Sequence, residues 1–259
     1  MNINKNSIIL MSDTKKISHI LNPNLYVPRK EAWIKKDIVS YENEYFHVKK
    51  TSSQELINEL LGSYLSQKIN LDAVDNRIAI DDNYNLYALS RIFYERNNRY
   101  FKVYEFGYNT YYMYDYKIKK DNILDSIQES YSKLLLDELL KMIALDLKMM
   151  QSDRNASNII FKITKHGYQL SKVYDFGEAY TGKFGSYFNP FIILFLNKNS
   201  LKKLIRQYPN IGEYIEKLNN IKIVEALEEI SVRFNITFSK SEYEFYMKKD
   251  EEITKILKM

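Results

Sequence analysis

Hydrophobic and polar positions in about the first 110 residues follow the pattern of strands, with one helix among them. Residues 43–49 are rich in aromatic and β-branched side chains, which favour a strand. Residues 53–68 place leucine, isoleucine and tyrosine at helical spacing, directly after hydroxyl side chains that suit a helix N-cap. Three more stretches continue the strand pattern: 77–80, 84–94 and 100–106. The first two flank a polar turn, and the third either pairs with them or leads out of the sheet.

From Asp121 onward the pattern changes to helical spacing. An apolar residue recurs every four positions from Leu135 to Leu147, which predicts a long and deeply buried helix. Residues 159–163 and 168–174 then predict a hairpin. The remainder predicts mostly helices. One is marked by Val224, Leu227, Ile230 and Phe234, and the last is opened by the capping-box pattern Ser241-Glu242-Tyr243-Glu244.

No internal repeat and no linker-like segment divides the chain. The change of pattern nevertheless separates two halves of different character. We therefore predict an α+β protein with a β-rich N-terminal lobe over residues 1–95 and a helical lobe over residues 96–259. The boundary between them is expected within residues 94–120.

Composition narrows the classes of protein that this pattern allows. The 259 residues include no cysteine and only three histidines, which excludes a disulfide scaffold, a thiolate zinc site and a catalytic cysteine. The net charge of +5 is smaller than a dedicated nucleic-acid binder would carry. Residues 8–11 form too short an apolar run for a signal peptide, and residues 191–196 fall far below the roughly 20 that a membrane span needs. We expect a soluble, cytoplasmic protein.

Residues 153–177 suggest a specific chemistry. Asp153 is the only aspartate with an asparagine five positions later, Asn158, and the predicted hairpin returns Asp175 towards this pair. Phosphoryl transfer from a nucleotide needs a carboxylate beside the acceptor hydroxyl, together with an amide oxygen and a second carboxylate that hold Mg²⁺. We predict that Asp153 is the catalytic base and that Asn158 and Asp175 bind Mg²⁺. The alternative is that these residues only cap a helix and a strand and form an ordinary turn.

The two segments resemble those of kinase-like folds, more closely HipA-like kinases and the related phosphatidylinositol 3/4-kinases than ordinary protein kinases. Those families carry Asp-Arg-His-x-x-Asn, of which residues 153–158 keep all but the histidine. The sequence Tyr174-Asp175-Phe176-Gly177 is similar to the Tyr-Asp-hydrophobic-Gly ending of HipA-like kinases. The resemblance implies a bilobal protein-kinase-like fold, ATP and Mg²⁺ as cofactors, and phosphorylation of a protein serine or threonine. Arg154 would then be a second catalytic-loop residue that orients the loop or stabilises transferred charge.

The first strand and helix agree with this resemblance. Alternation along the strand turns Lys49 towards the site, so Lys49 is expected to bind the nucleotide phosphates, with Glu59 of the following helix as its ion-pair partner. HipA-like sequences often carry an Asn-Glu pair in that helix, which favours Glu59 over Glu55. Lys50 is the competing lysine, although alternation turns it away. Both lysines could instead simply end an exposed strand.

The segment 88–96 resembles the connection between the lobes in HipA-like kinases. Backbone groups of Arg91, Ile92 and Phe93 are therefore expected to contact the adenine of ATP. Arg91 departs from the residue order that is usual there.

The phosphate-binding loop is the clearest departure from the family. HipA-like kinases have a glycine-rich turn there, whereas no glycine occurs in residues 1–61. Residues 27–33 are the candidates for its place, with Arg29 or Lys30 against phosphate, although Pro28 lacks a backbone donor. This loss weakens the expected grip on the nucleotide and leaves the metal site intact.

Other functions remain open. The same motifs also resemble small-molecule phosphotransferases of the aminoglycoside or choline kind, although those carry His-Gly-Asp where this chain has Gln151-Ser152-Asp153. The missing glycines suggest a pseudokinase or binding module. Tyrosines and lysines in residues 111–120 offer a stacking surface for nucleic acid, but core packing and solvated charge explain them better. The resemblance to toxin-like kinases implies a protein substrate and an antitoxin or other inhibitory partner.

Overall fold

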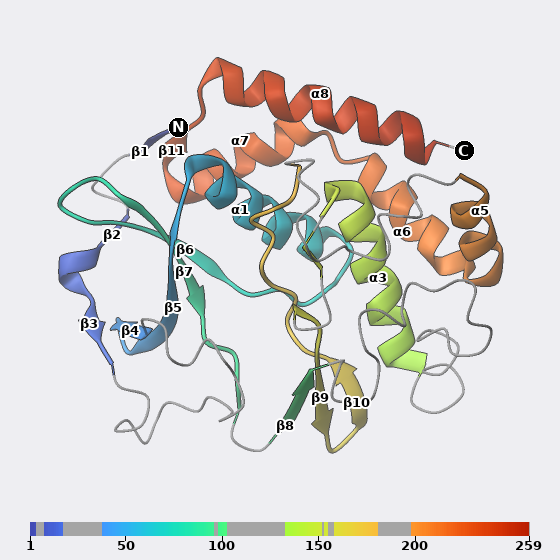
Figure 1. The fold of residues 1–259 in the computed structure, drawn as a ribbon, viewed down its shortest axis with the longest axis horizontal. Coiled ribbons are helices and arrows are strands. Elements are labelled where there is room, and N and C mark those ends of the chain that lie inside the picture. The colour runs from blue at the N-terminus through green and yellow to red at the C-terminus, as the bar shows by residue number, and fades with distance from the viewer. Residues whose placement is uncertain are drawn as a thin grey trace.

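The computed structural model describes residues 1–3, 8–17, 38–95, 98–102, 133–151, 153–154, 158–180 and 198–258. Our expectations for Arg29, Lys30 and residues 111–120 lie outside these residues. Within them, strands gather towards the N-terminal end of the chain and helices towards the C-terminal end (Figure 1). The structure is therefore mixed α+β, as predicted.

The N-terminal part is a six-stranded sheet with the strand order β2-β6-β7-β5-β4-β3. Its strands are β2 (Ile9–Leu10), β3 (Lys15–Lys16), β4 (Ile38–Tyr41), β5 (Glu44–Thr51), β6 (Asn76–Ile80) and β7 (Leu86–Arg91). A short 3₁₀ helix, η2 (Met11–Asp13), lies between β2 and β3. The turn between β4 and β5 has two residues, Glu42 and Asn43, both with positive φ (49° and 64°). That geometry is the two-residue turn that matches the twist of paired strands.

Helix α1 (Ser53–Lys68) follows β5 and carries one of the site residues. Its N-terminus is a capping box, in which Ser52 Oγ accepts from the Glu55 N–H and the Glu55 carboxylate accepts from the Ser52 N–H at 2.8 Å. Leu56, Leu60 and Leu61 are buried against the rest of the core. Because one face of α1 meets the sheet and another meets the C-terminal helices, the helix joins both parts of the molecule.

The C-terminal part is built mainly from helices. They are α3 (Lys133–Met149), α5 (Lys198–Gln207), α6 (Pro209–Asn219), α7 (Ile223–Phe234) and α8 (Lys240–Leu257). Two small sheets accompany them: β8 (Arg99–Lys102), β9 (Ile160–Thr164) and β10 (Gly167–Leu170) form one, and β1 (Asn2–Ile3) with β11 (Ile236–Thr237) forms the other. Helix α3 is buried along most of its length, as its apolar stripe predicts.

Of the two alternatives for the aromatic stretch after residue 99, the structure shows the one that leads out of the large sheet, because β8 pairs with β9. Two sequence predictions need correction in detail. The return strand of the hairpin ends at Leu170 and not at Tyr174, because Val173 next bonds to the connection between α1 and β6, where it forms a parallel bridge with Ala73. The capping box of α8 begins at Ser239, two residues before the predicted position.

Candidate active site

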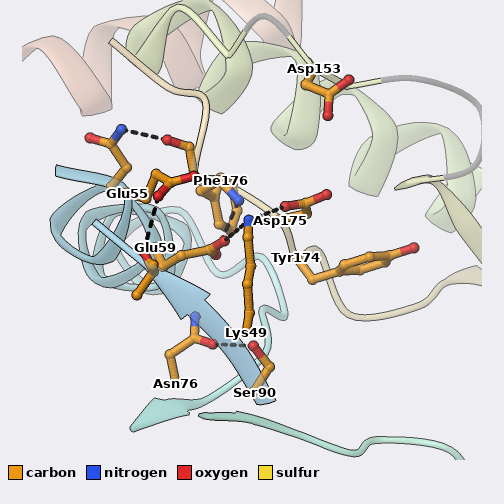
Figure 2. Close-up of polar contacts among 12 residues, drawn as sticks. Lys49, Glu55, Glu59, Asn76, Ser90, Asp153, Tyr174, Asp175 and Phe176 are labelled. Carbon is orange, nitrogen blue, oxygen red and sulfur yellow. Dashed lines mark hydrogen bonds and ion pairs between the residues drawn. The ribbon is translucent and has the colours of Figure 1, made fainter. Parts of the chain in front are cut away.

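Lys49 lies at the centre of a group of charged side chains that come from distant parts of the sequence. Its Nζ is 3.1 Å from Asp175 Oδ1 and 3.7 Å from Glu59 Oε1 (Figure 2). Burial alone would lower the pKa of Lys49, but the two carboxylates outweigh it and raise the pKa above its ordinary value. The lysine is therefore charged, and it links β5 to α1 and to the segment after β10.

Glu59 is buried, and it holds two parts of the site at once. One carboxylate oxygen faces Lys49, and the other accepts the backbone N–H of Phe176 at 3.0 Å. Burial and the nearby Asp175 charge raise the pKa of Glu59 to about 7, while Lys49 opposes the shift. Glu55, one turn earlier, is occupied by the capping box. The structure thus brings Glu59, the expected partner, to the lysine.

Asn158 connects the loop at residues 153–158 to Asp175. Its Nδ2 donates to Asp175 Oδ2 at 3.1 Å and to the backbone carbonyl of Asp153 at 3.0 Å. The side chain of Asp153 lies on the same loop, apart from the Lys49 contacts (Figure 2). The side chains of Lys49, Glu59, Asn158 and Asp175, from β5, α1, the loop and the segment after β10, are therefore neighbours in space.

Arg154 is fully buried. Its guanidinium bonds to the Asp146 carboxylate of α3, with Nε 3.1 Å from Oδ2, and also to the backbone carbonyl of Tyr174. The same group lies over the Phe176 ring, 5.0 Å from its centroid. Of the two roles expected for Arg154, orienting the loop fits this position, since a fully buried guanidinium does not face the surface.

The backbone of the segment Asp175-Phe176-Gly177, which we call the Asp-Phe-Gly segment, is fixed by buried side chains. Asp175 has a left-handed conformation with φ of 62°, and the buried amide of Gln151 donates to its carbonyl. A Cβ added at Gly177 would lie 3.0 Å from Lys49 Nζ and 3.5 Å from Glu59 Oε1. Glycine at this position therefore leaves room for the ion pair itself.

The three residues expected at the adenine make contacts of their own. The N–H groups of Arg91 and Ile92 donate to the carbonyls of Asp75 and Tyr45, at 3.0 and 2.9 Å. The Arg91 side chain pairs with a glutamate of β5, and the Phe93 ring lies beside aromatic rings. Any adenine contact from Arg91 or Ile92 must therefore use groups other than these two N–H donors.

An apolar and aromatic cluster lies next to the charged group. Ile38, Tyr94 and Ile160 are its buried members, and further rings pack around them. The Phe93 ring is 6.1 Å from that of Tyr174, the residue before Asp175. The cluster is buried, and it meets the charged group through Tyr174.

Asn158 and Asp175 fit a magnesium ion by their chemistry. Mg²⁺ prefers hard oxygen ligands and is usually held by one or two carboxylates plus substrate phosphates. Asp175 supplies a carboxylate that is one-third exposed, and the Asn158 amide, whose Nδ2 donates to that carboxylate, would have to turn its oxygen towards an ion bound there. The adjacent Lys49 ammonium would face the phosphates that complete such a site.

Several residues that build the site have no obvious signal in the sequence. Gln151 belongs to no motif, and Asn58, which donates to the carbonyls of Gly177 and Ala179, stands out only as the neighbour of Glu59. Asp146 does have a signal, because a charged residue within the buried stripe of α3 calls for a buried partner. Arg154 is that partner.

This architecture is a kinase-like fold, and it matches solved structures over nearly the whole chain. One is the Helicobacter pylori proinflammatory kinase CtkA, at 15% identity and a TM-score of 0.57, with 96% of each chain covered. Another is a chain from the Shewanella oneidensis MR-1 toxin–antitoxin complex of HipA, HipB and operator DNA. There the identity is 13% and the TM-score 0.55, with 98% of this chain and 73% of that chain covered.

The predicted resemblance to HipA-like kinases is thereby confirmed as a likeness of fold. No protein-family model and no curated protein matches the sequence. Among the described residues, no helix has the length and apolar character that crossing a membrane requires.

Proposed function

We propose that this protein is an ATP- and Mg²⁺-dependent phosphotransferase that acts on a protein serine or threonine. The observation that carries the proposal is the convergence of Lys49, Glu59, Asn158 and Asp175 within contacts of 3.0 to 3.7 Å. These residues come from separate segments, and their types are those that grip nucleotide phosphates and a metal ion. The kinase-like fold that this chain shares with the solved CtkA and HipA structures supports the proposal.

Each residue has a distinct role in this proposal. Lys49 binds the phosphates, and Glu59 keeps its ammonium in place while holding the Phe176 N–H. Asn158 and Asp175 hold Mg²⁺, which when bound neutralises charge on the phosphates and orients them. Asp153 accepts the proton of the attacking hydroxyl. Arg154 positions the loop from its buried pair with Asp146.

The test is γ-phosphate transfer from labelled ATP, read by mass spectrometry for protein acceptors and by phosphate release. Asp153→Ala and Asp175→Asn should each lower transfer by roughly 10²-fold or more, since each removes one part of the catalytic set. Asp175→Asn should also weaken binding of Mg²⁺-ATP, whereas Asp153→Ala should leave binding nearly unchanged. Absence of Mg²⁺-dependent nucleotide binding by the wild type, or full activity in both variants, would refute the proposal.

Two adjacent lysines provide a matched control. Lys49 is in the ion-pair group, whereas Lys50 is exposed on the opposite side of β5. Lys49→Met should abolish tight Mg²⁺-ATP binding, and Lys50→Met should keep it. Equal loss in both variants would show that the effect comes from net charge and not from this site.

The acceptor and the partner are separate parts of the proposal. The Shewanella structure contains HipA together with HipB and DNA, and by analogy we propose a protein acceptor and an inhibitory partner protein here. The acceptor is tested by comparing purified proteins with a panel of aminoglycosides and amino alcohols in the same assay. Phosphorylation of a small alcohol without phosphorylation of any protein would refute the protein acceptor and leave the proposed phosphotransfer chemistry standing.

A further inference from the structure

Helix α8, far along the chain from the site, reaches the Asp-Phe-Gly segment through one buried hydroxyl. Tyr246 of α8 and Asn58 of α1 are almost completely buried, and the Tyr246 Oη lies 2.7 Å from Asn58 Oδ1. Asn58 in turn donates from Nδ2 to the carbonyl of Gly177 at 2.8 Å and to that of Ala179 at 2.5 Å. The contact chain runs from the C-terminal helix to the two carbonyls that follow Asp175.

The hydrogen-bond donors and acceptors of the Asn58 amide show why the Tyr246 hydroxyl is needed. Both N–H groups of the Asn58 amide are used on the two carbonyls, so its oxygen needs a donor from elsewhere. No water reaches a fully buried oxygen, and the Tyr246 hydroxyl is the donor in position. Without it, the amide oxygen is left buried and unsatisfied, or the amide turns and brings its oxygen against the two carbonyls.

We propose that Tyr246 is a positioning residue for the Asp-Phe-Gly segment, acting through Asn58. The hydroxyl sets the orientation of the Asn58 amide, and the amide sets the backbone on the C-terminal side of Asp175. Glu59 and Gln151 fix the Phe176 N–H and the Asp175 carbonyl, so Asn58 completes the control of this backbone. The effect of Tyr246 on catalysis rests on the proposed function. Its effect on the backbone does not, because that effect depends only on the contacts among Tyr246, Asn58 and the two carbonyls.

Tyr246→Phe isolates the hydroxyl. The ring keeps its edge-on contact with Tyr180, at 5.4 Å and 88°, and only the hydroxyl is lost, with its contacts to Asn58 and to the Gln54 carbonyl. We expect the Mg²⁺ concentration for half-maximal phosphotransfer to rise roughly three- to tenfold, as loss of one buried hydrogen bond would give. KM for ATP at saturating Mg²⁺ should change little. Hydrogen exchange at the Ala179 and Tyr180 amides should become faster in the absence of ligands.

Tyr243→Phe is the matched control on the same helix. The Tyr243 ring lies edge-on to Phe238 at 5.8 Å, and loss of its hydroxyl leaves the bond between Tyr246 and Asn58 in place, so neither readout should move. A second variant, Asn58→Leu, removes the link from the other side and should reproduce both effects. In that background Tyr246→Phe should add almost nothing, because the amide through which the hydroxyl acts is already absent.

The outcomes are separable. Wild-type exchange and Mg²⁺ dependence in Tyr246→Phe would overturn the inference. So would an effect that persists in the Asn58→Leu background, since Tyr246 would then act through its 3.3 Å contact with the Gln54 carbonyl or through packing. If the wild type transfers no phosphate, the proposed function fails, and the exchange comparison alone decides whether Tyr246 fixes the segment.

Discussion

Gly62 allows the Phe176 ring to pack directly on helix α1, and Gly62→Ala tests how far the site depends on that packing. A Cβ at this position would lie 2.2, 2.4 and 2.7 Å from three carbons of the Phe176 ring. Restoring even the 3.4 Å of ordinary contact would require the ring to retreat by about 1.2 Å. Phe176 is fully buried, and the Arg154 guanidinium lies over it, so the ring has no free space to enter.

Two energies of opposite sign decide the result. Alanine in a helix interior is more favourable than glycine by roughly 1 kcal/mol. Overpacking a buried site costs about 1–3 kcal/mol, and a clash with three ring carbons belongs at the upper end. We therefore expect Gly62→Ala to destabilise the protein by about 1–2 kcal/mol. Because the Phe176 N–H bonds to Glu59, we also expect weaker binding of Mg²⁺-nucleotide.

Urea unfolding and nucleotide titration measure the two effects. Gly212→Ala in α6 is the control, because its Cβ would meet only one methyl group, Ile205 Cγ2, at 3.2 Å. Its stability should rise by up to about 1 kcal/mol, since one tight methyl contact is all that opposes the helix preference for alanine. A second substitution, Phe176→Leu, should recover part of the stability lost in Gly62→Ala. A gain of about 1 kcal/mol in Gly62→Ala would refute the reasoning, as helix propensity alone predicts it.

Three further predictions concern the supports of the site and of α8. Arg154→Met should lower the free energy of unfolding by about 3–5 kcal/mol, because it leaves the Asp146 carboxylate buried and unpaired. Adding Asp146→Leu to this variant should restore most of the lost stability in urea unfolding, which checks the cause. Ser239→Ala should lower the stability by about 1 kcal/mol in thermal unfolding, and Ser241→Ala by only a few tenths, because Ser239 caps α8. The reverse order would show that Ser241 is the cap, as the sequence predicted. The third prediction concerns Glu242. Burial alone would raise the pKa of Glu242, but its pairing with the N-terminal amine and its hydrogen bonds from Ser239 outweigh burial and lower the pKa below 4.5. The stability that this carboxylate adds is present above pH 4.5 and lost as pH falls below it; Glu242→Gln should flatten this part of the acid melting profile.

Local patterns were sufficient to predict elements whose signals are local. Ser52 and Glu55 at the start of α1 form the hydrogen bonds of a capping box, as their motif predicts. The apolar stripe of α3 predicted a buried helix, and α3 is buried along most of its length. The end of β10 depended on a partner 100 residues earlier, the bridge between Ala73 and Val173, and no local signal marks it. The cap of α8 was misplaced because two serines near its start suit the same motif, and only one satisfies it.

The site could be predicted where its residues form a spaced motif. Asn158 and Asp175 are such residues, and the structure brings them into contact, whereas the role of Asp153 stays a prediction. Alternation in β5 distinguished Lys49, which pairs with Asp175, from Lys50. The buried groups that hold them, Gln151 and Asn58 among others, bond to backbone atoms, and any residue type can present a carbonyl. Their partners are therefore defined by the fold and not by the sequence around them.

The bridge between Ala73 and Val173 also limits how the two parts of this protein can move. The Val74 N–H donates to the Val173 carbonyl and the Val173 N–H donates to that of Asp72, both at 2.9 Å, and both valines are buried. Opening the molecule along this edge would break both bonds. A rotation of the sheet against the helices that kept these bonds would pivot about this bridge, and Lys49 would then travel farther than Ala73.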